Sequence, residues 1–432
     1  MSKSRVLIKF AKNKNMTEEA YINKLPFELF EIILRKINGS VLGKCRRVCK
    51  GWKELIDSSE YLWHEKCRKE FKNSSKIAKR KSGNQCTWYH IYRNLYQWSD
   101  LKEYDIEIRE FYKFSLSDIS HVLNIDYGIL PLRDDKGTFL YDTSTLKYIT
   151  VALPERNCLK IMNNDYVTIM QVKSGIYIQR TVDSDTPEFL TEAYLKTDDF
   201  ILANTILYLH HNRNIFSLDL TLQEFTPEFI VTIDYSIKEM QYNEGVLYLF
   251  TDYGYIATLD TSSHCFKVKY RPINCPVEWI KQIKHIRAVD DKNFVCYSRN
   301  LIKIEVDQYK HLYLEFPPIT ALFFYVDIIL FATGDGKILL YRLSSQETSF
   351  KPTFETLARL PEGKVAVQLD VCERRSGPLI VASTFFELYV IEIPFFPYEK
   401  QTTKSTFTAD KLHMYKRMQK LKERLKSNNN RD

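Results

Sequence analysis

The residues of this chain that could do chemistry are its 9 His, its 9 Cys and one short glycine-containing segment. The only adjacent histidines, His210-His211, stand just before the turn residues Asn212-Arg213, which predicts an exposed loop pair rather than a metal site. Gly334-Asp335-Gly336-Lys337 has the glycines and lysine of a phosphate loop, but no helix follows, so we expect a turn between strands. The serine-hydrolase and zinc-peptidase patterns are both missing from the sequence. We therefore expect a non-catalytic protein without cofactor or metal.

The cysteines are scattered along the chain, and no two of them form a Cys-x-x-Cys pair. An odd number of dispersed cysteines is unlike a disulfide framework or a zinc site, so we expect free thiols in a reducing compartment. The longest apolar runs are too short to span a membrane, and the N-terminal residues do not form a signal peptide. These features predict a protein of the cytoplasm or nucleus with no membrane partner.

The net charge of +8 is unevenly distributed along the chain. Residues 1–100 contain 22 Lys+Arg against 10 Asp+Glu, a net +12, and residues 401–432 contain 9 against 3, a net +6. Residues 101–400 contain 31 against 41, a net −10. A basic chain is a candidate for nucleic-acid binding, but the largest part of this one is acidic, so nucleic acid is not the expected partner.

Three short helices are expected within residues 21–70, after a flexible segment at 1–20. Pro26 suits a first helical turn, and Leu29, Ile33 and Ile37 then recur every four residues. Asn38-Gly39 is expected to end this helix and Ser40 to cap the next. The second helix carries its apolar residues on one side: Leu42, Cys45, Val48, Cys49, Trp52, Leu55 and Ile56. The third helix is short and contains Leu62-Trp63. Because so small a unit cannot bury all of these side chains, a partner surface is expected.

Residues 25–63 resemble the F-box family along their whole length and without a gap. The matching positions are Leu25-Pro26, Glu28-Leu29, Ile33-Leu34, Ile37, Leu42, Val48-Cys49-Lys50-x-Trp52, Leu55-Ile56 and Leu62-Trp63. Val41 and Gly43 depart from the pattern, in which an acidic and an apolar residue are usual. The resemblance implies docking to a Skp-type linker protein, and through it to a cullin scaffold, by Leu25, Pro26, Leu29, Ile33, Leu34, Val48, Cys49 and Trp52. Some of these residues are expected to be internal core instead.

Residues 71–109 are expected to connect this unit to the rest of the chain. Lys72 to Lys81 is basic and Ser-rich, which predicts a loop. Trp88, Tyr92, Leu95 and Trp98 then follow at helical spacing, which predicts a helix with an aromatic face. We expect this helix to pack the F-box region onto the next domain.

A repeat of a tight turn followed by a short apolar strand runs through residues 110–397. The strands are 138–142, 176–180, 215–219, 255–260, 301–306, 337–341 and 387–391, at intervals of 36 to 50 residues. A period of about 40–45 residues is that of four-stranded propeller blades. The segment resembles a degenerate WD-repeat β-propeller with seven blades, although six or eight remain open, and each of these strands would be the third of its blade.

The ends of this propeller are expected to meet. Pro394 and Pro397 follow the last strand at once, so the seventh blade lacks an outer strand. Residues 110–117 alternate between apolar and polar and could supply it, which would close the ring. The fold class expected is therefore multidomain, with a small all-α F-box followed by an all-β propeller and a helical tail.

The turns before the seven strands would share one rim, which in WD-repeat relatives usually receives the ligand. By this resemblance the candidate substrate contacts are His211, Arg213, Asp252, Tyr253, Arg299 and Asp335. The alternative is that they are solvated turn residues. The acidic body favours a protein substrate with basic patches.

Residues 398–432 form a basic tail in which Met414, Met418, Leu421 and Leu425 predict one helix. Three interpretations stay open: a solvated helix, a helix that binds a partner or a second chain, and a nuclear import signal. The import signal could equally be Lys79-Arg80-Lys81.

Together, the resemblances imply the substrate-recognition adaptor of a SKP–cullin–F-box (SCF) ubiquitin ligase, acting by proximity. One alternative is an interaction protein that uses the same two surfaces outside any ligase. A second is a nucleic-acid-associated protein that uses its basic ends.

Overall fold

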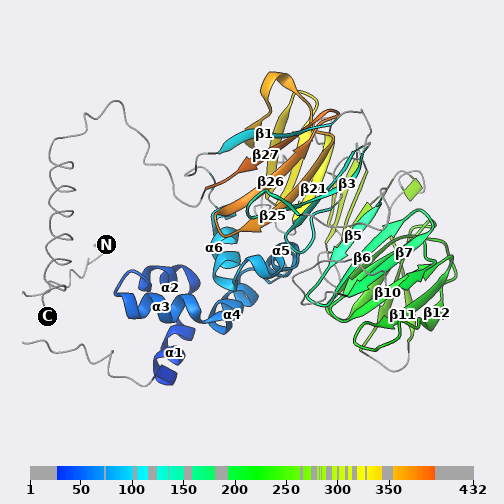
Figure 1. Cartoon of the computed structure of the whole chain (residues 1–432), viewed down its shortest axis with the longest axis horizontal. Helices are drawn as coiled ribbons and strands as arrows, with labels where there is room; N and C mark the ends of the chain where they lie inside the picture. The colour runs from blue at the N-terminus through cyan, green and yellow to red at the C-terminus, as the bar shows by residue number, and fades with distance from the viewer. Residues whose placement is uncertain are drawn as a thin grey trace, which may run out of the picture.

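The structure of the protein is a computed structural model that describes residues 27–394, apart from several gaps. The longest gaps are 115–123, 150–157, 181–192 and 343–353. Helices come first in the chain and antiparallel sheets follow (Figure 1). The flexible start at 1–20, Leu25, Pro26, Arg299 and the tail at 398–432 lie outside the described residues.

The F-box region consists of four helices: α1 (Phe27–Lys36), α2 (Gly39–Cys45), α3 (Lys50–Ser58) and α4 (Glu60–Glu70). The prediction of one long second helix is wrong, because Cys49 is extended and caps α3 by accepting a hydrogen bond at Sγ from the Trp52 N–H, over 3.5 Å. One apolar stripe continues across both helices, so the spacing hides the break. Ser40 is not the cap of α2 either: the Asn38 side chain accepts from the Val41 N–H at 2.9 Å.

The connector is helical throughout its described core, with α5 (Ser74–Ser82), the 3-10 turn η2 (Gly83–Gln85) and α6 (Trp88–Ser99). The prediction of a basic loop at 72–81 is therefore wrong. Helix α5 buries Ser74, Ser75, Ala78 and Ser82, and packs against strand β25, so tertiary contacts override its weak helix propensity. The aromatic helix is confirmed as α6, with Tyr92, Leu95 and Trp98 buried.

The described residues form seven antiparallel sheets. The first has three strands, β2 (Ile129–Asp134), β3 (Gly137–Asp142) and β4 (Tyr148–Ile149). The next three sheets have four strands each. The second sheet consists of β5 (Lys160–Asn163), β6 (Val167–Val172), β7 (Gly175–Arg180) and β8 (Ala193–Leu195), and the third of β9 (Asp199–Ala203), β10 (Ile206–His211), β11 (Asn214–Asp219) and β12 (Glu228–Thr232). The fourth consists of β13 (Ile237–Asn243), β14 (Val246–Thr251), β15 (Tyr255–Asp260) and β16 (Val268–Pro272).

The last three sheets also have four strands each. The fifth sheet consists of β17 (His285–Ala288), β18 (Phe294–Ser298), β19 (Leu301–Val306) and β20 (Lys310–Tyr313), and the sixth of β21 (Ile319–Tyr325), β22 (Ile328–Thr333), β23 (Lys337–Arg342) and β24 (Glu355–Arg359). The seventh consists of β25 (Gln368–Arg374), β26 (Gly377–Ser383), β27 (Glu387–Glu392) and β1 (Glu107–Lys113). Six of the seven predicted strands are the third strands of their sheets, and 138–142 is the middle strand of the three-stranded sheet.

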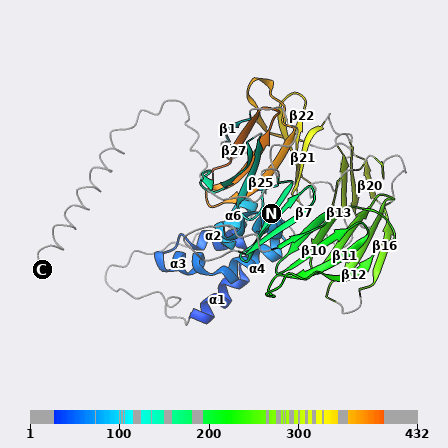
Figure 2. The ribbon, with the colours of Figure 1, turned by 45° about the vertical axis from the view of Figure 1, so that its right-hand side comes forward.

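The predicted closure by the N-terminal strand is confirmed. Strand β1 pairs antiparallel with β27, from Glu107 opposite Glu392 to Lys113 opposite Glu387. The strand starts three residues before the predicted one. Buried apolar clusters join consecutive sheets: Leu130 and Leu132 pack with Val381 and Val390 across this closure. The domain is a β-propeller, and Figure 2 shows its sheets arrayed beside the helices.

Two expectations on the propeller's own residues have different outcomes. Gly334 to Lys337 forms the turn between β22 and β23, as predicted, with Gly336 at a φ of 79°. The prediction that His210 and His211 form an exposed loop pair is wrong, because both belong to β10 and His210 is only 5% exposed. No helix in the described part of the chain is long and apolar enough to cross a membrane.

Candidate interaction sites

The helices of the F-box region leave a group of apolar side chains in solvent. Val48 is 63% exposed and Leu29 is 50% exposed. The group, called here the F-box apolar face, consists of Leu29, Ile32, Ile33, Val41 and Val48. Large apolar side chains gathered in one small region mark interaction surfaces.

The opposite sides of the same helices form an ordinary core. Phe30, Leu34, Leu42 and Ile56 are buried there, and the ring of Trp52 packs edge-on against Phe30 with 4.7 Å between centroids. Leu34 thus belongs to this core, as expected for some members of the predicted docking set, and half-buried Trp52 packs against it.

The predicted docking set is therefore divided by the structure. Leu29, Ile33, Val48 and Cys49 are exposed. Sequence reasoning missed Ile32 and Val41. Ile32 completes an i, i+3, i+4 stripe with Leu29 and Ile33, and that spacing could have identified it.

The short helix α2 is held tightly against the rest of the domain. The Gly39 N–H donates to Glu70 Oε1 at 2.9 Å, and the Tyr92 hydroxyl donates to Glu70 Oε2 at 2.5 Å. A Cβ on Gly39 would lie 2.1 Å from Tyr92 Cζ, so this close approach requires glycine. Arg46 stacks over the Tyr89 ring at 4.0 Å and donates from Nη2 to Asp57 Oδ2 at 2.9 Å. These contacts fix α2 relative to α6.

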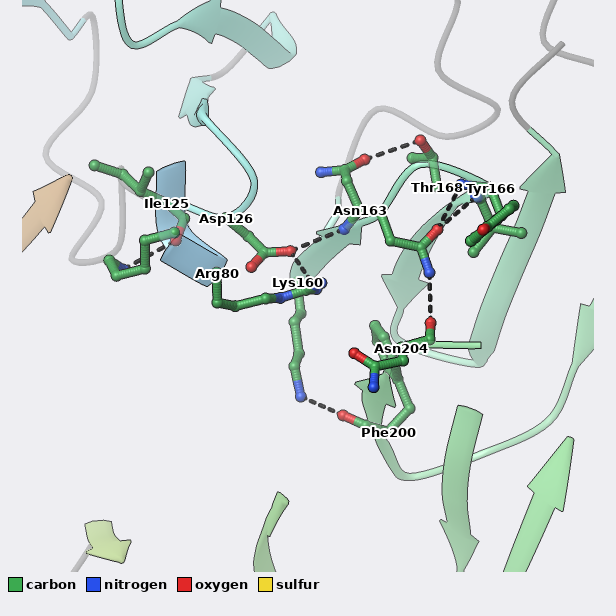
Figure 3. Close-up of polar contacts among 12 residues, drawn as sticks. Arg80, Ile125, Asp126, Lys160, Asn163, Tyr166, Thr168, Phe200 and Asn204 are labelled. Carbon is green, nitrogen blue, oxygen red and sulfur yellow. Dashed lines mark hydrogen bonds and ion pairs between the residues drawn. The ribbon is translucent and has the colours of Figure 1, made fainter. Parts of the chain in front are cut away.

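Helix α5 is anchored to the propeller by ion pairs. Arg80 Nη2 lies 2.8 Å from Asp126 Oδ2, and the same carboxylate accepts from the Asn163 N–H at 2.9 Å (Figure 3). Lys81 Nζ lies 2.6 Å from Asp370 Oδ1. Lys79 Nζ donates to the carbonyls of Gly83 and Cys86. The Lys79-Arg80-Lys81 run is thus used in structural contacts and is not available as an exposed import signal.

Helix α6 is joined to the last sheets around a buried carboxylate. Glu373 Oε1 accepts from Trp98 Nε1 at 2.8 Å and from the Tyr325 hydroxyl at 3.1 Å. Asn94 Nδ2 donates to the Arg374 carbonyl at 2.8 Å. Burial raises the pKa of Glu373, although the donors from Trp98, Asn94 and Tyr325 act in the opposite direction. Sequence reasoning gave no signal for this carboxylate, since it is one acidic residue in a strand.

The connector contacts one end of the propeller's sheets. Lys76 pairs with Glu244 in the β13–β14 turn, and Asn84 donates to Asp165 in the β5–β6 turn. Arg93 donates to the Arg375 carbonyl in the β25–β26 turn at 2.6 Å. These turns all join first to second strands. Because adjacent strands are antiparallel, the turns before the third strands lie at the other end of the sheets. The predicted substrate rim therefore faces away from the connector.

The structure brings part of the predicted rim together. Arg213 Nη1 donates to the Asp234 carbonyl at 3.1 Å, and the next residue, Tyr235, packs against Tyr253 at 5.3 Å between ring centroids. Asp252 lies 3.9 Å from Lys238. Asp234 and Tyr235 belong to the connection between β12 and β13, which has no repeat signal, so sequence reasoning missed them.

The other two described rim residues have partners outside this group. His211 ends β10, two residues before Arg213, and its Nδ1 is 3.5 Å from Asp198 Oδ1. Asp335 pairs with Lys337 at 2.5 Å in the β22–β23 turn, two sheets further along the chain. Within the described residues, no three His, Cys, Asp or Glu side chains are arranged to hold a metal ion.

Residues 22–69 match the model of the F-box-like family, and this match coincides with α1 to α4. Residues 22–69 are therefore an F-box-like domain. Domains of this family generally bind a Skp-type linker and serve as adaptors.

Other likenesses are short or distant. Mitogen-activated protein kinase kinase kinase A of Dictyostelium discoideum is 34% identical over 73 residues, which are 17% of this chain. The chain spans only 7% of that protein's length. Among solved structures, Hsv2 of Kluyveromyces lactis is 14% identical, with a TM-score of 0.42 over 60% of this chain and 88% of that one. The AfRom2 CNH domain is 11% identical, with a TM-score of 0.43 over 67% of this chain and all of that one.

Proposed function

We propose that the chain is the substrate-recognition adaptor of an SCF ubiquitin ligase. The F-box apolar face docks the Skp-type linker, and the propeller binds a protein substrate. The observation that carries the proposal is this face itself: five large apolar side chains of a matched F-box remain in solvent. Covering them with a partner removes apolar area from water, which is favourable.

The geometry supports an adaptor that works by proximity. The buried contacts of α5 and α6 hold the F-box region in a fixed relation to the propeller. A substrate on the far rim and a linker on the F-box apolar face would then be kept at a defined separation. Such positioning raises the effective concentration of the substrate at a ubiquitin-charged enzyme without chemistry from this chain. We place this activity in the cytoplasm or nucleus, where ligase and substrates meet.

The experiment is quantitative affinity purification from cells in which the proteasome is blocked. The test variant carries Ile33→Asp and Val48→Asp, which put two charges on the F-box apolar face while leaving its core intact. The matched control is Phe229→Asp, which changes an exposed apolar residue of β12. We expect linker and cullin to be lost only from the test variant, while the propeller's partners remain or increase in abundance.

The other outcomes are equally informative. Linker recovered without any cullin would replace the ligase with an interaction protein outside it. Absence of linker from the wild-type chain would refute the proposal.

A further inference from the structure

At the rim of the β13–β16 sheet, Tyr235 contacts three further tyrosines, Tyr253, Tyr255 and Tyr270. Tyr235 stacks on Tyr255 with 5.0 Å between centroids and 9° between planes. It meets Tyr253 at 5.3 Å and 44°, and Tyr270 at 5.7 Å and 89°. The other three rings therefore surround Tyr235 at different angles. This group is called the tyrosine cluster below.

The cluster is open to solvent and its outer member is held in place. Tyr253 is 69% exposed. It lies in the β14–β15 turn, where the Gly254 N–H donates to the Thr251 carbonyl at 3.1 Å and the Asp252 N–H donates to the Ser236 carbonyl at 3.0 Å. Gly254 has a φ of 77°, and a Cβ there would meet Ile280 at 2.5 Å. A rigid turn presents the ring at little entropic cost.

The chemistry of the cluster favours a cation. The face of an aromatic ring carries negative potential, and Lys or Arg side chains bind there. This chain uses such contacts itself: Arg46 lies over Tyr89 at 4.0 Å and Arg35 over Tyr61 at 4.3 Å. In the described part of the chain, no cation is seen over a ring of the tyrosine cluster.

Two carboxylates and two cations lie beside the cluster. Asp234 and Asp252, which directly precede Tyr235 and Tyr253 in the chain, are exposed. The Asp234 N–H donates to the Tyr270 hydroxyl at 3.0 Å, so the backbone of Asp234 is held beside the cluster. Lys238, 3.9 Å from Asp252, and Arg213, which donates to the Asp234 carbonyl, offset these two charges. The preference for a cation therefore rests on the ring faces and on the acidic balance of the larger domain. Residues 101–400 as a whole contain 31 Lys+Arg against 41 Asp+Glu.

We infer that the tyrosine cluster is a binding site for an arginine or lysine side chain of the protein substrate. The cation would rest on the faces of Tyr253 and Tyr235. The inference rests on the proposed function, since it assumes that the propeller receives a protein. It narrows the substrate class to proteins with an exposed basic side chain in an accessible segment.

The test uses the full chain and four capped peptides of one length. Three share a Gly-Ser background with a central arginine, lysine or citrulline, and the fourth is proline-rich. Citrulline keeps the shape of arginine without its charge. Ligand-observed NMR titration gives the affinities. We expect the arginine or the lysine peptide to bind and the citrulline peptide not to, and the tighter-binding cation identifies the side chain that the site prefers.

Two variants of one position complete the test. Tyr253→Ala should weaken binding of the cationic peptides about fivefold or more, whereas Tyr253→Phe should retain it, because the ring face is kept. Equal binding of citrulline, tighter binding of the proline-rich peptide, or an unaffected Tyr253→Ala variant would overturn the inference. Both variants should bind the linker normally, so a failure of the wild-type chain to bind the linker would count against the proposed function alone.

Discussion

Lys81 and Asp370 form an ion pair that joins the connector to the propeller, with 2.6 Å between Nζ and Oδ1. The two side chains are only 12% and 3% exposed. Lys81 Nζ also donates to the Ile125 carbonyl, and Asp370 Oδ2 accepts from the Ile125 N–H. A basic helix that follows the F-box is thereby tied to the last sheet of the ring. The propeller and the connector are one structural unit rather than two.

The first prediction concerns this pair. Lys81→Ala should lower the free energy of unfolding by about 3 kcal/mol, because it leaves a buried carboxylate without its partner. Lys69→Ala, at an exposed pair with Glu65, is the control and should change it by less than about 1 kcal/mol. Urea unfolding of the full chain measures both. Equal effects of the two changes would show that the Lys81 contact adds nothing by being buried.

The second prediction concerns Glu373. Burial raises its pKa, so the folded state keeps the proton to a higher pH than the unfolded state does. The stability gained is complete below the ordinary pKa of glutamic acid and is lost as the pH rises through the raised value. Each pH unit in that window should cost up to about 1.4 kcal/mol.

Glu373→Gln tests this pH dependence, since its amide oxygen can still accept from Trp98 and Tyr325. Urea unfolding at a series of pH values should give a shallower fall in stability for the variant than for the wild type. Parallel curves for the two proteins would mean that folding does not raise the pKa of Glu373.

The third prediction compares two glycines of α2. Gly39→Ala should destabilise the chain by about 1–3 kcal/mol, because its Cβ would overlap the Tyr92 ring, which is held by Glu70. At Gly43 a Cβ meets nothing within 4 Å, so Gly43→Ala should be neutral or stabilise by up to about 1 kcal/mol. Thermal unfolding of the two variants measures the difference. Opposite signs are expected, and a shared loss would point to a general intolerance of α2.

The fourth prediction decides which residue caps α2. Asn38→Ala should cost about 1 kcal/mol, because it leaves the Val41 N–H without its acceptor. Ser40→Ala should cost much less, since the Ser40 hydroxyl only donates to Asn38 Oδ1. Denaturant unfolding compares them, and a larger effect at Ser40 would restore the assignment expected from the sequence.

The elements that the sequence predicts best are those whose signal is local. The α1 stripe of Leu29 and Ile33 repeats within one helix, and each propeller strand follows its own turn. The closure of the ring by β1 followed from alternation in one segment and from prolines in another. In each case neighbouring residues carried the pattern.

The errors and the questions that the sequence left open arise where distant residues decide. A Lys- and Ser-rich segment becomes helix α5 because Asp126 and Asp370, far along the chain, pair with Arg80 and Lys81. Leu34 is core because Leu42 and Ile56 fold over the same side. The grouping of Arg213 with Tyr253 depends on Asp234 and Tyr235, which lie in a connection without a repeat.

The central claim is that the F-box apolar face binds the linker. Calorimetric titration of a purified Skp-type linker into the full chain tests it most directly, with Val48→Asp as the variant and Phe229→Asp as the control. We predict tight binding to the wild type and the control, and a loss of at least about 30-fold for Val48→Asp, which places a charge in a buried contact. Undiminished binding of Val48→Asp, or no binding to the wild type, would contradict the account.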